Sequence, residues 1–144
     1  MIERYLARIS GPLLDRIDIH LRVPALAYRD LAGDDSAEPS AVIRARVEAA
    51  RERQRQRFPG STGVQANAHM SSREVRRHCR QGGAIAELLQ LAVDRLGLSA
   101  RACHRILKVA RTIADLAGCE ALHPAHVREA IQYRSTARAA IPAG

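Results

Sequence analysis

Regular helical periodicity in the second half of the chain is the feature that most constrains its fold. Ile85, Leu88, Leu89, Ala92 and Leu96 are spaced at i, i+3, i+4, i+7 and i+11. That spacing places them on one face of an amphipathic helix, which Gly97 ends. Many of the apolar residues in this half of the chain therefore lie on helix faces, and other helices must cover those faces.

A second helix of the same kind is expected from Ser99 to Gly118, because Ser99 is a good N-cap and Gly118 a good terminator. Its predicted buried stripe is Cys103, Ile106, Leu107, Ala110, Ile113, Ala114 and Ala117. A further helix starts at His123-Pro124, where proline suits the first turn. Its predicted buried residues are Val127, Ala130 and Ile131.

A short helix is predicted just before these three, because Ser71-Ser72-Arg73-Glu74 fits a capping box. Gly82-Gly83 ends it. Helices of this length with short connections favour a compact helical bundle, so we expect a mainly α-helical domain over residues 71–138. Residues 139–144 are expected to be a disordered tail.

Residues 28–70 have a different character. Residues 30–40 are acidic and without periodicity, which is typical of a linker or a surface loop. From Ser40, a possible cap, to Arg57 we expect a helix with one apolar line and a wholly polar end, RERQRQR. The apolar line consists of Ile43, Val47 and Ala50. Phe58-Pro59-Gly60 stops the helix, and a mobile loop is expected up to His69.

The first part of the chain, residues 1–27, contains one convincing strand pattern. Apolar and polar residues alternate from Ile17 to Val23, after a short helix predicted over residues 2–9. A single strand leaves its backbone groups without partners, and nothing else in the chain is a good partner. We therefore interpret residues 1–27 as the trailing edge of a sheet whose other strands lie outside this sequence, either partly frayed or packed on the bundle.

The basic residues are almost all arginine. Lysine and arginine number 23 against 15 acids, for a net charge of +8, and Lys108 is the one lysine in the sequence. A Walker A loop needs Gly-Lys-Ser/Thr, whereas Lys108 lies between Leu107 and Val109. The chain therefore cannot be a complete P-loop nucleotidase.

Other classes of function have little support in the sequence. Aromatic residues make up 3%, which argues against base stacking on single-stranded nucleic acid. No catalytic triad or carboxylate pair is legible, and neither the three cysteines nor His123-x-x-His126 has the spacing of a metal site, so we expect no metal. No apolar run is long enough to span a membrane and no signal peptide is present, so a cytoplasmic protein is expected.

Two arginines are the candidate functional residues. Arg16 lies on the turn that leads into the predicted strand, where it could project from the end of a sheet or pair with Asp15 or Asp18. Arg101 follows the cap Ser99 by two residues, where the positive end of the helix dipole disfavours a cation. Its position is explained either by an anion such as phosphate binding there or by a merely solvated arginine.

The two segments that carry these arginines resemble a known family. RYLARISGPLLDRIDIHLRVP, residues 4–24, is similar to the late part of the ATPase core in Mg-chelatase-like AAA+ ATPases of the competence protein ComM/YifB family. LGLSARACHRILKVARTIADLAG and HPAHVREAIQYR, residues 96–118 and 123–134, are similar to the helical lid of the same family. Together with the helices between them, these segments span nearly the whole chain in family order.

The resemblance implies roles for both arginines. Arg16, in LLDRID, matches the arginine finger that completes a neighbouring subunit's ATP site in a ring, expected to be a hexamer. Arg101 matches the sensor-2 arginine, which detects the γ-phosphate from a lid helix. The Walker A and Walker B motifs lie upstream in the family, so the resemblance implies a C-terminal fragment. Such a fragment binds no cofactor and is no enzyme on its own, whereas the parent uses ATP and magnesium.

The expected function is thus the lid and arginine-finger part of a ComM-like, DNA-translocating motor that acts in natural transformation. Its partners would be the upstream ATPase core, further copies in the ring and, as a possibility, DNA. An alternative is a stand-alone basic helical DNA-binding module. That alternative depends on the net charge and on the arginine-rich run that contains Arg51, Arg53, Arg55 and Arg57.

Overall fold

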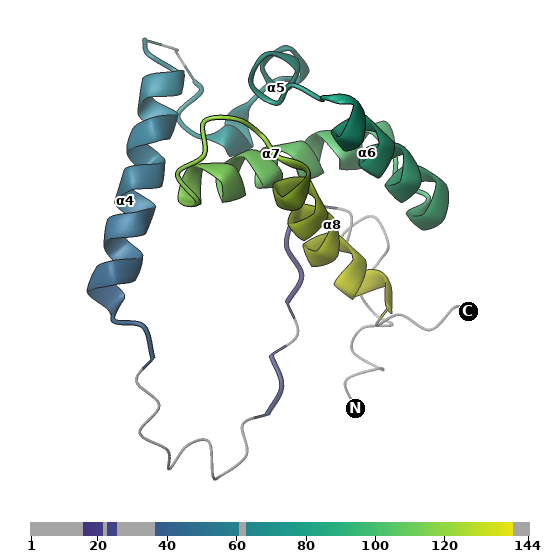
Figure 1. Ribbon diagram of the computed structural model, residues 1–144, viewed down its shortest axis with the longest axis horizontal. Helices are drawn as coiled ribbons and strands as arrows, with labels where there is room; N and C mark the ends of the chain where they lie inside the picture. The colour runs from purple at the N-terminus through teal and green to yellow at the C-terminus, as the bar shows by residue number, and fades with distance from the viewer. Residues whose placement is uncertain (1–15, 22, 26–36, 61–62, 140–144) are drawn as a thin grey trace.

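The protein is mainly α-helical, as the sequence predicts (Figure 1). The computed structural model describes residues 16–21, 23–25, 37–60 and 63–139, with side chains up to Arg134. These residues form five α-helices and one short 3-10 helix, with no strand among them. The elements are α4 (Ser40–Arg57), η1 (Asn67–His69), α5 (Ser72–His78), α6 (Gly83–Leu96), α7 (Ala100–Leu116) and α8 (Pro124–Ala139).

Most predicted helix ends are confirmed by their capping geometry. The Ser71 hydroxyl accepts from the Glu74 N–H, and the Glu74 carboxylate accepts from the Ser71 N–H, which completes the predicted capping box of α5. Ser99 caps α7 by accepting from the Ala102 N–H at 3.2 Å. Gly97 ends α6 in the left-handed conformation, with φ +57°. The cap predicted at Ser40 is wrong, because Pro39 is the N-cap and no side chain bonds there.

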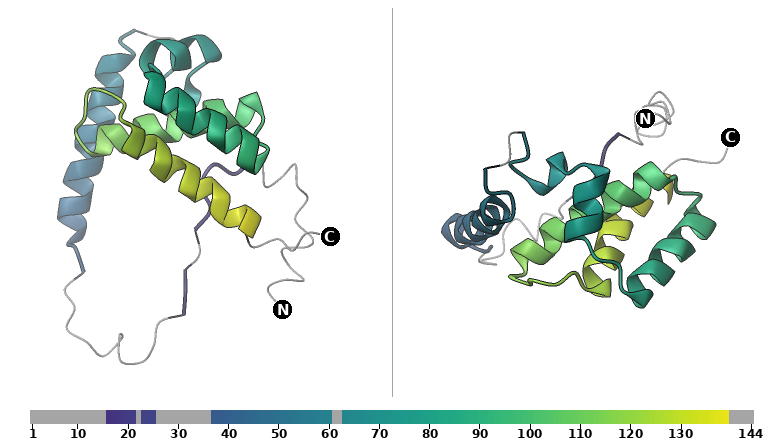
Figure 2. Two further views of the ribbon diagram at one scale, coloured as in Figure 1. Left: turned by 45° about the vertical axis from the view of Figure 1, so that its right-hand side comes forward. Right: turned by 90° about the horizontal axis from the view of Figure 1, so that it is seen from above.

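Helix α7 is the central element of the bundle. It packs against α4, η1, α5 and α8, and α6 packs against α8 (Figures 1 and 2). Figure 2 shows α4 at one end of α7, on the opposite side of the bundle from α6. This arrangement follows from the residue pattern of α7, because its broad apolar face needs cover from more than one neighbour, and the bordering Arg111 and Asp115 are buried as well.

The core is aliphatic and centres on α7. Ile106, Leu107 and Ala110 of α7 meet Val127 of α8. The other buried members of this cluster are Phe58, Met70, Val75, Cys79, Ile85, Leu89 and Ala130. The predicted stripe of α7 is thus correct at its centre, whereas Cys103 and Ile113 are half-buried and Ala117 is exposed. Val127 and Ala130 of α8 are buried as predicted, and Ile131 is half-buried.

The apolar line predicted on α4 is mostly exposed. Ala50 is buried, but Ile43 and Val47 are 41% and 37% exposed, and the neighbouring Val42 is 50% exposed. The cause is the position of the helix, since it contacts α7 through its C-terminal half while its N-terminal turns extend beyond the bundle (Figure 1).

The expected division between residues 28–70 and residues 71–138 does not follow the packing. Phe58, Asn67 and Met70 are buried, and η1 packs against α7. The second half of the predicted mobile loop therefore belongs to the bundle, and α4 is fastened to it as well. Residues 28–36 and the tail from residue 140 lie outside the described residues, so the expectations for them are not tested.

The strand predicted from Ile17 to Val23 does not form among the described residues of that segment. The backbone is not paired with another strand there. Instead, the His20 N–H donates to the carbonyl of Tyr133 in α8 at 3.0 Å. A strand needs a neighbouring strand to satisfy its backbone, so without one the segment packs on a helix. The helix predicted over residues 2–9 lies outside the described residues.

Candidate functional site

Arg101 occupies the second position of α7, immediately after its capped N-terminus. Its side chain is exposed and has no hydrogen-bond or ion-pair partner among the described residues. Ser99 satisfies one backbone N–H of this first turn, at Ala102. The remaining first-turn amides of a helix have no intrahelical partner and carry a partial positive charge. Arg101 and the helix end thus present positive charge to the same region of solvent.

The segment that carries Arg16 is attached to the bundle near this helix end. Asp18 lies 3.4 Å from the guanidinium of Arg105 in α7 and 3.7 Å from that of Arg134 in α8. Arg134 also approaches the carbonyl of Ile17 at 3.5 Å. Arg105 lies one helical turn after Arg101, so the structure brings the segment of Arg16 to the N-terminal half of α7.

Arg16 itself is exposed, and within the described part of the chain it has no ion-pair partner. The pairing with Asp18 considered from the sequence is not observed, because Asp18 bonds Arg105 and Arg134 instead. Anchoring of Asp18 and His20 leaves the Arg16 guanidinium available to a group outside the bundle.

The four arginines of the run at the end of α4 differ in their surroundings. Arg55 is engaged by Glu52, with N···O distances of 2.6 and 2.8 Å. A Cβ placed on Gly118 would come within 3.4 Å of Arg53, so Arg53 lies beside the C-terminal end of α7. Arg51 lines an open groove of about 900 Å³ between α4, residues 59–60 and 64–69, and the end of α7. Three of the four are exposed, and Arg57 is not.

Arg57 belongs to a buried polar network that the sequence analysis missed. Its guanidinium donates to both carboxylate oxygens of Asp115, at 2.7 and 2.5 Å, and to the side-chain oxygen of Asn67 at 2.8 Å. Arg111 approaches Asp115 at 3.1 Å, and the Asn67 amide donates to the same carboxylate at 2.8 Å. Arg57 is therefore held in place by α7 and is not a free nucleic-acid contact.

The electrostatics of the network favour an ionised carboxylate. Burial raises the pKa of Asp115, but hydrogen bonds from Arg57 and Asn67 and the charges of Arg57 and Arg111 outweigh it and hold the pKa below its ordinary value. Gln54 completes the network by accepting from the Asn67 backbone N–H at 3.0 Å. The arrangement fastens α4, η1 and α7 together.

A signal for this network was present in the sequence. Arg111 and Asp115 are four residues apart and lie next to Ala110 and Ala114, so they border the apolar stripe of α7. Charged residues in that register need partners when the helix is packed on several sides. Asn67 carried no comparable signal, because it lies in a stretch without periodicity.

The cysteines and histidines form no metal cluster in the part of the chain that the structure describes. Cys79 is buried, and burial raises the pKa of its thiol to about 11, which makes it a poor nucleophile. The His126 ring accepts from the backbone N–H of His123 at 3.1 Å and so caps α8. Over the described residues, no helix has both the length and the apolar character needed to cross a membrane.

These features define a class of protein: a mainly α-helical bundle domain with an exposed arginine, unpaired across residues 16–21, 23–25, 37–60 and 63–134, at the N-terminus of its central helix. Comparison with protein families sharpens that class. Residues 37–134 match the family described as magnesium chelatase, subunit ChlI C-terminal, and residues 1–31 match magnesium chelatase, subunit ChlI. The chain belongs to the magnesium chelatase ChlI C-terminal family.

Curated relatives point the same way. The chain is 44% identical over 138 residues to competence protein ComM of Haemophilus influenzae, an alignment that covers 95% of this chain and 26% of that protein. It is 41% identical over 140 residues to YifB of Escherichia coli and 40% identical over 136 residues to YifB of Salmonella typhimurium, covering 94% of this chain and 26% of the relative in each case. The chain thus spans about a quarter of the length of these relatives, and the resemblance to the ComM/YifB family is confirmed.

Proposed function

We propose that this chain is the helical lid of a Mg-chelatase-like ATPase and that Arg101 is its nucleotide-sensing residue. One observation carries the proposal: Arg101 is exposed in the first turn of α7, and no residue that the structure describes pairs with it. A cation at that position is electrostatically unfavourable for the helix itself. A bound phosphate would reverse the sign of that interaction, because it would be attracted both to the guanidinium and to the free amides of the helix end.

Arg16 has the second role in the proposal, that of an arginine finger acting on a neighbouring subunit of a ring, which we propose to be a hexamer. A finger needs an always-charged donor that is held in place and free at its tip. Both conditions fit Arg16, because Asp18 and His20 attach its segment to α7 and α8 while its own side chain is exposed.

The remaining parts of the catalytic machinery belong to the parent protein in this proposal. The upstream ATPase core of the same polypeptide would supply the Walker motifs, which hold ATP and magnesium, and the lid would complete the site. This chain alone would then hydrolyse no ATP. On the resemblance to ComM, we also propose that the parent ring is a DNA-translocating motor of the cytoplasm that acts in natural transformation.

The test uses a longer protein of this family that carries this domain together with its ATPase core. We expect Arg101→Ala and Arg16→Ala to lower ATP turnover, the finger variant by roughly a thousandfold. Arg95→Ala is the matched control, because Arg95 is an exposed arginine in the last turn of α6 and should leave turnover unchanged. Unchanged turnover in both Arg101→Ala and Arg16→Ala would refute the two roles.

A mixing experiment separates the two arginines. If Arg16 acts in trans, Arg16→Ala subunits mixed with subunits that lack the Walker A lysine should regain part of the activity, because some interfaces then contain one intact half from each. Arg101→Ala subunits should show no such rescue if Arg101 acts on the nucleotide of its own subunit. Equal rescue of both variants would contradict this assignment.

A further inference from the structure

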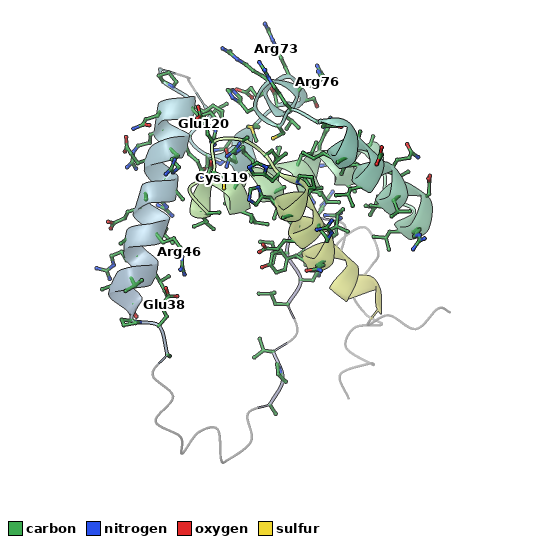
Figure 3. The ribbon with its side chains drawn as sticks, in the orientation of Figure 1. Glu38, Arg46, Arg73, Arg76, Cys119 and Glu120 are labelled. Atoms are coloured by element: carbon green, nitrogen blue, oxygen red, sulfur yellow. The ribbon has the colours of Figure 1, made fainter. Side chains whose placement is uncertain are left out.

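Helix α5 and the residues after it carry a dense group of exposed arginines. Four arginines occur within eight positions, Arg73, Arg76, Arg77 and Arg80, and we call them the α5 arginine patch. All four are exposed, and within the described residues none has an ion-pair or hydrogen-bond partner. Figure 3 shows Arg73 and Arg76 projecting from α5 away from the rest of the bundle.

The surroundings of the patch offer little negative charge. The acidic residue of α5, Glu74, already accepts from the Ser71 backbone N–H at 2.6 Å. The neighbouring face of α7 contributes His104, 3.4 Å from the Ser72 hydroxyl, and Lys108, which donates to the Ala68 carbonyl. Glu74 is thus the one acid of α5, set against three arginines of the helix, and the contacts from the neighbouring face of α7 come from a histidine and a lysine.

A hollow of about 340 Å³ lies beside the patch, between the end of α4 and α5. Its lining contains Arg57, Arg77 and His78 together with the carboxylate of Glu74. Burial lowers the pKa of His78, and the charges of Arg57 and Arg77 lower it further. The opposing charge of Glu74 has a smaller effect on this pKa than either arginine, which fits the excess of arginine over acid around the hollow.

Half of the six arginines of α4 are paired within the chain. Arg46 makes a two-bond ion pair with Glu38, with both N···O distances 3.0 Å (Figure 3). Arg55 is paired with Glu52, and Arg57 is paired with the buried Asp115. In the α5 arginine patch, by contrast, none of the four arginines has a partner within the described residues.

We infer that the α5 arginine patch binds the sugar-phosphate backbone of nucleic acid without reading its sequence. A guanidinium presents a planar fork of donors that matches a phosphate group. Successive turns of α5 place Arg73 and then Arg76 and Arg77 about 5 Å apart along the helix, so the row can reach neighbouring phosphates of a strand. The patch contains no aromatic residue for base stacking. Its donors are all guanidinium groups, which can bind phosphates or the edge of guanine, and duplexes of unrelated sequence separate these two modes in the test below.

The inference deepens the proposed function. It rests on that function for one point only, the choice of DNA as the nucleic acid. It does not need the nucleotide roles of Arg16 and Arg101. Because binding is measured without ATP, failure of the patch to bind DNA would leave those roles standing, and loss of those roles would leave the patch unaffected.

Three charge-matched variants of this chain test the inference. The patch variant changes Arg73, Arg76 and Arg77 to Gln. The control variant changes Arg44, Arg95 and Arg128 on other helices to Gln; all three are exposed and have no partner in the described part of the chain. A rival variant changes Arg51, Arg53 and Arg55 to Gln. Each variant loses three positive charges. A difference in DNA affinity between them therefore reports where the charges lie and not how many there are.

Binding of a fluorescein-labelled DNA duplex is followed by anisotropy at a series of salt concentrations, and circular dichroism verifies that each variant is folded. We expect the patch variant to bind roughly tenfold or more weakly than the control variant at low salt, with the slope of log affinity against log salt reduced by about 3. The variants should rank in the same order of affinity on duplexes of unrelated sequence.

Several results would overturn the inference. One is an equal loss of DNA affinity in all three variants, which would show a general charge effect. Another is a larger loss of affinity in the rival variant than in the patch variant, which would place the contact on α4. A third is binding of poly-glutamate as tightly as DNA at the same salt, which would identify the partner as an acidic protein. Absence of DNA binding by the unmodified chain at low salt would also reject it.

Discussion

Arg57, the last residue of α4, donates two hydrogen bonds to the carboxylate of Asp115, in the last turn of α7, at 2.7 and 2.5 Å. The two residues are 58 positions apart in the sequence. Asp115 is fully buried, and the side chain of Arg57 is 14% exposed. This pair is therefore a principal attachment of α4 to the bundle.

Removal of Asp115 should destabilise the domain strongly. In Asp115→Ala, Arg57 and the buried Arg111 both lose their counter-ion, and breaking a buried pair from one side costs about 3 kcal/mol or more. Urea unfolding followed by circular dichroism measures this loss. Asp94→Ala is the control, because Asp94 is an exposed acid of α6 that bonds only Gln90 and should change stability by less than about 0.5 kcal/mol. Equal stability of the two variants would show that the network contributes nothing.

Acidification should weaken the domain through His126. Burial, followed by the charges of His123 and Arg111, lowers the pKa of His126 below 6.5 in the folded protein. The unfolded chain therefore binds the proton more readily, so the free energy of unfolding should fall as the pH is lowered from about 8 to 5.

The variant that checks this is His126→Gln, because a glutamine oxygen can still accept from the His123 N–H. Urea unfolding at several pH values should give a shallower pH dependence for the variant than for the unmodified chain. His78, whose pKa is also lowered, would account for the part that remains. The same pH dependence in both proteins would exclude His126 as its source.

The two residues that begin α7 should respond to mutation in opposite ways. Ser99→Ala removes the hydroxyl that accepts from the Ala102 N–H and should cost about 1 kcal/mol of stability. Arg101→Ala removes a cation from the positive end of the helix and should leave stability unchanged or raise it by a few tenths of a kcal/mol. Thermal and urea unfolding compare the two variants. Strong destabilisation by Arg101→Ala would mean that Arg101 has a structural role within the bundle.

The three cysteines should differ in reactivity. Cys79 is buried with a pKa of about 11, and partial burial raises the pKa of Cys103 as well. A thiol reacts as its thiolate, so an alkylating reagent at mildly alkaline pH should modify Cys79 last. Mass spectrometry of tryptic peptides gives the order. In urea all three should react at similar rates, and equally fast reaction of Cys79 and Cys119 in the folded protein would contradict the described packing.

Sequence periodicity predicted the helices well because each carries a local signal of its own. The spacing from Ile85 to Leu96, with Gly97 after it, contains the information for both the face and the end of α6. The capping box of Ser71 and Glu74 is equally local. Such signals need no knowledge of the neighbouring elements, so the sequence alone was sufficient.

The predictions that failed depended on neighbours. The alternation from Ile17 to Val23 is a genuine strand pattern, but a strand forms only beside another, and the described residues supply a helix instead. Asn67 looked like a loop residue, yet its buried position depends on Asp115 and Thr112 of α7. The apolar line of α4 was recognised correctly, but how much of it is covered depends on where α7 ends.

The residues of the candidate site also divide into those whose surroundings a local signal predicts and those whose surroundings depend on another helix. The exposed position of Arg101 follows from the local cap at Ser99, and the sequence predicted both. The separation of Arg57 from Arg51, Arg53 and Arg55 could not be predicted, because all four belong to one uniform polar run. Only the position of Asp115 on another helix distinguishes the arginine that is paired inside the bundle from those outside it.

Helix α7 has 17 residues and is about 25 Å long, with Arg101 at one end and Asp115 near the other. Because Asp115 holds Arg57, one continuous helix joins the exposed end at Arg101 to the C-terminal end of α4.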